Sequence, residues 1–324
     1  MSATGFIHED SEWRELLELV SAAMDRDISL VEKDYWVIHT LWALLHQGFE
    51  LWFRGGTSLS KGFDLIERFS EDIDVRIDAG AVEGLTDPKL SWKNEKQGIQ
   101  ERNRWFDDLT AALDVPACQV ARNPAGSDPR CRSAWIEVTY PALAVGTLPG
   151  AMKSFVLLEA GRARVVPFVP RSLSSWVHDW LENSEQLGDY RDNRPQGVRC
   201  IHPWVTCLEK IDAIARRFPR SDADAASFVR HYEDTARILG ARGSLPALEG
   251  APVELAREML SSRDIRSIPA PGEIAFASDA TSARWREVQQ SWEAIGDMFW
   301  GERITLDEAC ATIRGFLVSL EGLR

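Results

Sequence analysis

The chain has 324 residues, of which 44% are hydrophobic and 27% charged, and its formal net charge is −13. This composition excludes an intrinsically disordered chain, because apolar residues are plentiful, and it argues against a general nucleic-acid coat protein, which needs a basic surface. The charge is uneven, since residues 1–110 carry 22 acidic and 12 basic side chains, whereas residues 191–242 carry 7 acidic and 10 basic ones.

The cysteines and the apolar stretches indicate the cellular location of the protein. Five cysteines without a Cys-x-x-Cys spacing predict neither a disulfide framework nor a zinc site, and they favour a reducing, cytoplasmic location. No apolar stretch approaches the roughly 20 residues of a membrane-spanning helix, and the first five residues show no signal-peptide pattern. We therefore expect no membrane partner.

The first predicted elements are two helices. Segments 11–25 and 29–46 place apolar residues at helical spacing. The period then changes, and the apolar run 51–53 predicts a short buried strand that ends at a glycine pair. We expect a further helix over residues 57–68.

The next segment predicts a strand with two different faces. From Asp72 to Ile77, charged and aliphatic residues alternate. Because successive side chains of a strand point to opposite faces, Asp72 and Asp74 should share one face and the aliphatic residues the other.

The remaining pattern divides the chain into two parts. Residues 80–110 predict a polar loop with a following helix. Strands are predicted at 135–140 and 154–160, and from about residue 172 the periodicity is helical to the C-terminus, interrupted by polar loops near 188–202, 240–252 and 262–283. We expect an α/β (α+β) fold, with a mixed α/β core domain over residues 1–170 and a helical domain over 171–324.

Asp72 and Asp74 are the first candidates for chemistry. Two carboxylates at i and i+2 of a strand lie roughly 7 Å apart on one face. Such oxygens suit hard divalent cations, and metals held in this way organise phosphoryl transfer. Taken alone, an acidic pair on a strand is more often a solvated face, so a second feature has to support the assignment.

The glycine pair before these carboxylates supplies that feature. Gly55 and Gly56 would let backbone N–H groups approach a phosphate, Ser58 can donate a hydrogen bond to a phosphate oxygen, and a helix N-terminus favours an anion. The segment does not match a P-loop, because Lys61 is in the wrong place. A glycine pair followed by Asp-x-Asp on another strand is nevertheless a stronger pattern than either motif alone.

Arg54–Lys61 followed by Phe69–Asp74 resembles the AbiEii toxin family, including its MenT members, within the DNA polymerase β-like nucleotidyltransferase superfamily. The resemblance covers roughly residues 30–240. It extends to the segments Glu32-Lys33-Asp34-Tyr35, Thr139-Tyr140-Pro141, Val156–Gly161, Glu209–Ala213 and Arg230–Asp234.

The resemblance implies a nucleotidyltransferase fold, with a small mixed sheet in the N-terminal half and a helical C-terminal half. It implies that Asp72 and Asp74 are catalytic and bind Mg²⁺. A third carboxylate is expected from an adjacent strand, and Glu159 is preferred over Glu137. Nucleotide binding is implied for Gly55, Gly56, Thr57, Ser58 and Lys61.

The helical domain is expected to complete this site. The resemblance implies that Lys210 neutralises the nucleotide phosphates as charge builds up in the transition state. It implies that Asp234 acts opposite this lysine, either as a base or by orienting it.

The function implied is that of a toxin-type, Mg²⁺-dependent nucleotidyltransferase with an NTP as substrate and a cognate antitoxin as partner. The expected acceptor is the 3′ end of tRNA, whose modification would block translation. A protein side chain or a small molecule such as an aminoglycoside is the alternative acceptor, and a non-catalytic binding protein is the alternative class. An RNA acceptor needs a local basic surface, which we expect from Arg216, Arg217, Arg220, Arg230 and Arg237. The sequence leaves open which NTP is used.

Overall fold

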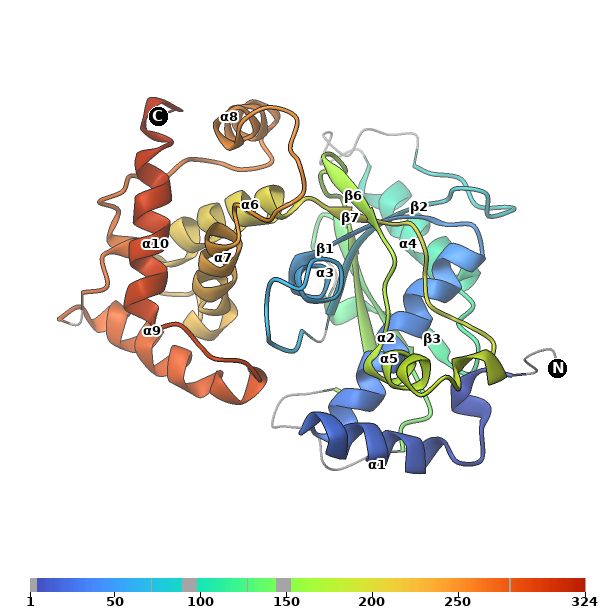
Figure 1. Ribbon diagram of the computed structural model, residues 1–324. Coiled ribbons are helices and arrows are strands. Elements are labelled where there is room, and N and C mark those ends of the chain that lie inside the picture. Colours follow the sequence, from blue (N-terminus) through green and yellow to red (C-terminus); the bar gives the residue numbers. More distant parts are fainter. Residues whose placement is uncertain are drawn as a thin grey trace. The chain divides into compact units, whose positions relative to one another are not determined.

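The computed structural model describes residues 5–70, 72–88, 98–126, 128–143, 153–279 and 281–323. The chain packs as two units, which can be traced by colour in Figure 1. The sheet unit comprises Met1–Gly62, Ser70–Ala163 and Pro170–Cys200, and the helical unit comprises Phe63–Phe69, Arg164–Val169 and Ile201–Arg324. This packing differs from a single linear division near residue 170, because residues 171–200 belong to the sheet unit.

The described strands form one mixed sheet in the order β3-β4-β5-β2-β1-β7-β6. Strand β1 (Glu50–Arg54) pairs antiparallel with β2 (Asp72–Asp78), and β2 pairs parallel with β5 (Val156–Gly161). The other strands are β3 (Gln119–Asn123), β4 (Ser133–Thr139), β6 (Phe168–Arg171) and β7 (Val198–Ile201). The mixed sheet and the α/β class predicted from the sequence are thus confirmed.

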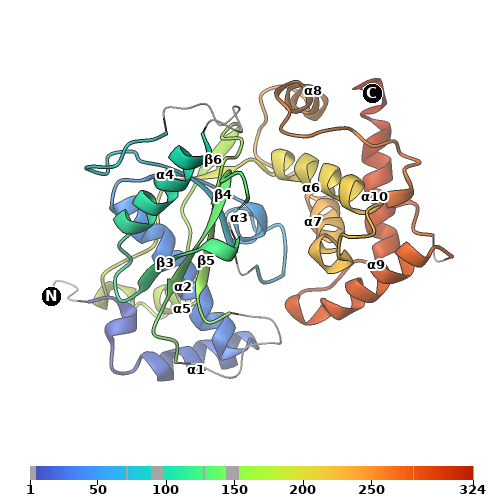
Figure 2. The same cartoon turned by 180° about the vertical axis from the view of Figure 1, so that it is seen from behind.

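Strand β2 has the two faces that its sequence predicts. Ile73 and Val75 are buried, whereas Asp72 and Asp74 are only partly covered. Helix α2 (Ile28–His46) packs against β1 and β5. It passes in front of the strands in Figure 1 and behind them in Figure 2, so it covers one face of the sheet.

A buried hydrogen-bond network fixes α2 to the segment that follows α5 (Trp176–Asn183). Its centre is Asn193, whose Nδ2 lies 2.7 Å from His39 Nδ1 and 3.1 Å from Tyr35 Oη, and whose Oδ1 lies 2.7 Å from His178 Nε2. Tyr35 Oη lies 2.8 Å from His8 Nδ1. Burial lowers the pKa of His39 to about 3 and those of His178 and His8 to about 4. These histidines are therefore neutral at pH 7.

The helical unit is built around α7 (Arg230–Gly240), which packs against α6 (Pro203–Arg217) and α10 (Leu306–Val318). Helix α6 begins with a proline at its first turn, where the missing N–H would have no helical partner. Helices α8 (Pro252–Ser262) and α9 (Ala283–Ala294) complete the unit. The helical C-terminal half is confirmed, and within the described part of the chain no helix is long and apolar enough to cross a membrane.

Some elements differ from the sequence prediction. Helix α3 (Gly55–Lys61) ends seven residues before Arg68 and is followed by a glycine, so a helix over 57–68 is wrong. Strand β7 lies where a polar loop was expected. Strands β3 and β6 were not predicted, because four or five residues at an edge carry too little alternation. The helix expected after the loop beyond residue 80 is α4 (Ile99–Ala112), whereas residues 89–97 of that loop lie outside the described residues.

Candidate active site

Three carboxylates lie on one face of the sheet. In the parallel pairing of β2 with β5, Asp74 is directly opposite Glu159, and Asp72 is opposite Leu157. Asp72 and Asp74 are two residues apart, so they share this face. The other candidate, Glu137, lies on β4, which flanks β5 on the side away from β2, and it is opposite Leu157. Its Oε1 accepts a hydrogen bond from Asn123 Nδ2 at 2.7 Å. The register therefore favours Glu159 as the third carboxylate.

Negative charge is concentrated where these strands meet. Burial raises the pKa of Glu159 to about 7, and the charges of Asp74 and Asp72 add to the effect, whereas Arg54 opposes it. A bound cation would relieve this repulsion, and carboxylate oxygens are the ligands that Mg²⁺ prefers. In donor chemistry and register, the acidic pair fits such an ion. Among the described residues, however, no three His, Cys, Asp or Glu side chains converge as a complete metal-binding group.

The turn from β1 into α3 passes directly over one of these carboxylates. Gly55 has a φ of +75°, and a Cβ atom at this position would lie 1.8 Å from Asp74 Oδ2. Only glycine fits, because it tolerates a positive φ and has no side chain to displace the carboxylate. The Thr57 hydroxyl donates to the backbone oxygen of Asp72 at 2.7 Å and so fastens α3 to β2.

The side chains expected to bind nucleotide have partners within the sheet unit. The Ser58 hydroxyl is buried and donates to the Phe53 oxygen at 3.3 Å. Lys61 Nζ lies 2.6 Å from Asp34 Oδ1 and 4.7 Å from the centre of the Trp176 ring. These contacts hold α3 in place. The backbone at Gly55 remains the part of the predicted nucleotide site that the structure brings next to Asp74.

A second cluster lies within the helical unit, where Lys210 of α6 meets Asp234 of α7. Lys210 Nζ lies 2.8 Å from Asp234 Oδ2 and 3.3 Å from His231 Nδ1. Arg68 takes both carboxylate oxygens, with Nε 2.8 Å from Oδ1 and Nη2 2.7 Å from Oδ2. The structure thus brings the two predicted residues together and adds an arginine that the sequence analysis missed. No periodicity or motif spacing indicates this arginine.

The electrostatics of the cluster bear on the two roles considered for Asp234. Burial would raise the pKa of this carboxyl, but Arg68 and Lys210 together hold it below its usual value. A carboxylate that is fully buried and held ionised by two cations is a weak proton acceptor. The geometry therefore supports Asp234 as the group that orients Lys210, not as a base.

The arginines expected to contact RNA are largely paired within the helical unit. Arg216 Nε lies 2.7 Å from Asp212 and Arg220 Nη2 lies 2.6 Å from Asp222. Arg237 lies 3.4 Å from Glu233, and Arg217 donates to the Ser227 oxygen at 3.0 Å. These acidic and carbonyl partners reduce the positive potential of the expected basic surface.

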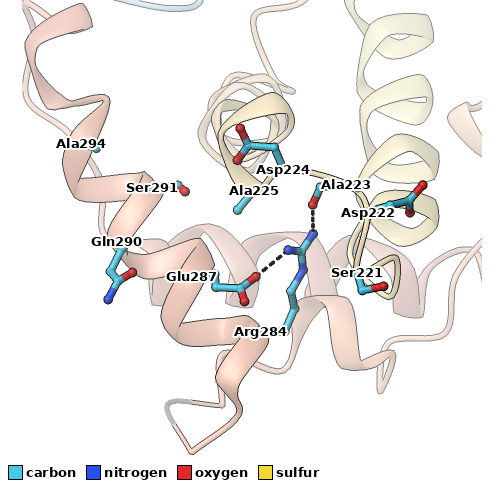
Figure 3. Close-up of a pocket in the computed structure, with 10 residues that line it drawn as sticks. All are labelled: Ser221, Asp222, Ala223, Asp224, Ala225, Arg284, Glu287, Gln290, Ser291 and Ala294. Atoms are coloured by element: carbon cyan, nitrogen blue, oxygen red, sulfur yellow. Dashed lines mark hydrogen bonds and ion pairs between the residues drawn. The ribbon is translucent and has the colours of Figure 1, made fainter.

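The helical unit also contains a polar pocket of about 590 Å³ between residues 221–225 and α9 (Figure 3). Arg284 lines it and donates to the Ala223 oxygen at 2.6 Å and to Glu287 at 2.7 Å. None of the residues implied in catalysis lines this pocket.

Comparison with protein-family models identifies the family that the chain matches. A family model described as nucleotidyl transferase AbiEii toxin, Type IV TA system, matches residues 42–311. This span includes both the carboxylates of the sheet unit and the Arg68–Lys210–Asp234 cluster. No curated protein shows significant similarity to the chain.

Proposed function

This chain belongs to the AbiEii family of nucleotidyl transferase toxins of Type IV toxin–antitoxin systems, and from that premise we propose that it transfers a nucleoside monophosphate from an NTP to the 3′ end of tRNA, which blocks translation. The observation that carries the proposal is the pairing of Asp74 with Glu159 on the same sheet face as Asp72. A cognate antitoxin is the partner that the family implies.

The reaction forms a bond between the acceptor 3′ oxygen and the α-phosphorus and breaks the bond from that phosphorus to the β-phosphate bridging oxygen. Pyrophosphate leaves, and the hydroxyl proton passes to solvent. Mg²⁺, held by Asp72 and Asp74 with Glu159 beside them, would neutralise the charge of the triphosphate when bound. The protein itself has to position the reactants and stabilise the developing charge.

Each proposed protein role follows from a contact within one unit. Gly55 brings the backbone of the β1–α3 turn against Asp74, so it aligns the acidic pair with the start of α3. In the helical unit, Asp234 fixes the Lys210 ammonium. We assign to this ammonium the stabilisation of phosphate charge in the transition state.

The test is incubation of the protein with each α-labelled NTP, Mg²⁺ and total RNA, followed by separation of RNA and protein. We expect label on tRNA from one preferred NTP, and none with a folded Asp74→Asn variant. Label on a protein or a small molecule would replace tRNA by the alternative acceptor. If neither the folded parent protein nor its folded Asp74→Asn variant labels any acceptor, the catalytic proposal is wrong.

One observation favours the alternative acceptor class enough to keep it in this test. Four of the five arginines expected to attract RNA have carboxylate or carbonyl partners, and the whole chain carries a charge of −13. A protein or a small-molecule acceptor would not need an extended basic surface. The salt dependence of RNA binding therefore belongs beside the labelling experiment, since each lost phosphate contact lowers its slope by about 0.7 for single strands.

A further inference from the structure

The cation cluster of the helical unit is formed by Arg68, Lys210 and Asp234. Arg68 and Lys210 share the single carboxylate of Asp234. We propose that Arg68 is a positioning residue for nucleotidyl transfer, which holds Asp234 so that the Lys210 ammonium keeps a fixed direction. This inference rests on the proposed function and names a residue that acts through Lys210.

The division of contacts on Asp234 supports this role. Arg68 binds both oxygens with a planar fork, which fixes the plane of the carboxylate. Lys210 then meets one oxygen, at 2.8 Å. The fork of Arg68 therefore also holds Asp234 Oδ2, the oxygen that the Lys210 ammonium meets.

Lys210 is the member of the cluster that can donate a hydrogen bond to a ligand. Its side chain is 9% exposed, whereas those of Arg68 and Asp234 are 2% and 0% exposed. An ammonium group has three donors. Among the described residues, Asp234 and His231 take two of them, which leaves one for a phosphate oxygen.

The backbone around Arg68 makes its position rigid. Arg68 forms an antiparallel bridge with Phe299, and hydrogen bonds join Phe69 N to the Met298 oxygen at 2.9 Å and Trp300 N to the Glu67 oxygen at 3.0 Å. Along the chain, Arg68 stands four residues before Asp72. The segment that leads into the carboxylate strand therefore carries the residue that orders the lysine.

A purely structural ion pair is the competing explanation, and a double-mutant cycle separates the two. We expect Arg68→Gln to lower kcat by about 10²-fold, as a misplacement of about 1 Å does, with little change in the KM for NTP. In a Lys210→Ala background, the same substitution should cost almost nothing further, because its effect passes through the lysine. If the losses in kcat of the two single variants multiply fully in the double variant, the proposal is wrong.

Two further variants keep the test interpretable. Arg68→Lys retains the charge but not the fork, so it should fold like the parent and have an intermediate kcat. Arg164→Gln is the matched control, since Arg164 belongs to the same unit, its side chain is 7% exposed, and it has two acidic partners, Glu258 and Asp264. This substitution should lower stability but leave kcat unchanged. Its effect on stability should add to that of Lys210→Ala.

A readout without NTP or metal distinguishes failure of this inference from failure of the proposed function. The probe is an amine-reactive acetylating reagent at pH 8. Peptide mass spectrometry measures the rate at which it acetylates Lys210. If Arg68 controls the ammonium, Arg68→Gln should slow acetylation, because Lys210 then pairs with Asp234 alone. Faster acetylation would indicate loosened packing, and an unchanged rate would show no influence; either result overturns the inference. Slower acetylation in a protein that labels no acceptor would retain the positioning role and refute the transferase.

Discussion

Replacement of Gly55 by alanine gives the sharpest test of the geometry beside Asp74. The added Cβ would lie 1.8 Å from Asp74 Oδ2 and 2.9 Å from Asp74 Cβ, whereas protein Cβ atoms essentially never approach another heavy atom below 3.0 Å. The carboxylate or the turn must therefore move by about 1 Å. A displacement of this size costs roughly 10²-fold in rate, and the positive φ adds roughly 1–2 kcal/mol of strain.

The assay is the initial rate of labelled nucleotide transfer, with urea unfolding of the same preparations. Gly84→Ala is the matched control, because Gly84 has a φ of +81° but no atom within 4 Å of the added Cβ. We expect both variants to lose similar stability and only Gly55→Ala to lose activity. Parent-like turnover of Gly55→Ala would refute the assignment of Asp74 to the site, and an equal loss in Gly84→Ala would attribute the effect to general strain.

Three further predictions concern the same unit. Asp74→Asn should abolish transfer without lowering the thermal midpoint, because it removes one of three crowded negative charges; parent-like turnover would contradict the metal assignment. Asp34→Asn should lower the free energy of unfolding by roughly 3 kcal/mol, since it leaves the Lys61 charge covered and unpaired, and an unchanged urea midpoint would refute this. Unfolding free energy should fall between pH 6.5 and about 4, because the unfolded histidines gain protons at their ordinary pKa near 6.5 while His39 and His178 stay neutral. The slope should approach about 1.4 kcal/mol per pH unit for each histidine, and His39→Gln should flatten it; a parent without this slope would contradict the burial argument.

The sequence predicted those parts of the fold that depend on local periodicity. The alternation in β2 defined both of its faces, and helical spacing identified the C-terminal half. The length of α3 was wrong, because residues 63–69 continue with polar and apolar residues that are compatible with a helix. Their actual position is set by backbone hydrogen bonds to residues 298–300, which local propensity does not encode.

The candidate site likewise contains residues that the sequence predicts and residues that only tertiary packing identifies. Asp72 and Asp74 follow from strand geometry, and Lys210 with Asp234 followed from a family resemblance. Arg68 could not be found, because its partner Asp234 is 166 residues away and tertiary packing alone decides which cation balances a buried carboxylate. The partners of Ser58 and Lys61 likewise depend on contacts across the sheet unit, so their assignment to nucleotide binding stays a prediction.

The repeated passage of the chain between the two units has a consequence for fragments of this toxin. Ile66 and Phe69 are 3% and 5% exposed, and residues 63–69 pack within the helical unit although both neighbouring segments belong to the sheet unit. A truncated product ending near residue 200 would leave this apolar segment without its partners, and a product starting there would lack Arg68. A premature stop or a start near residue 200 should therefore yield neither unit as a complete folded module.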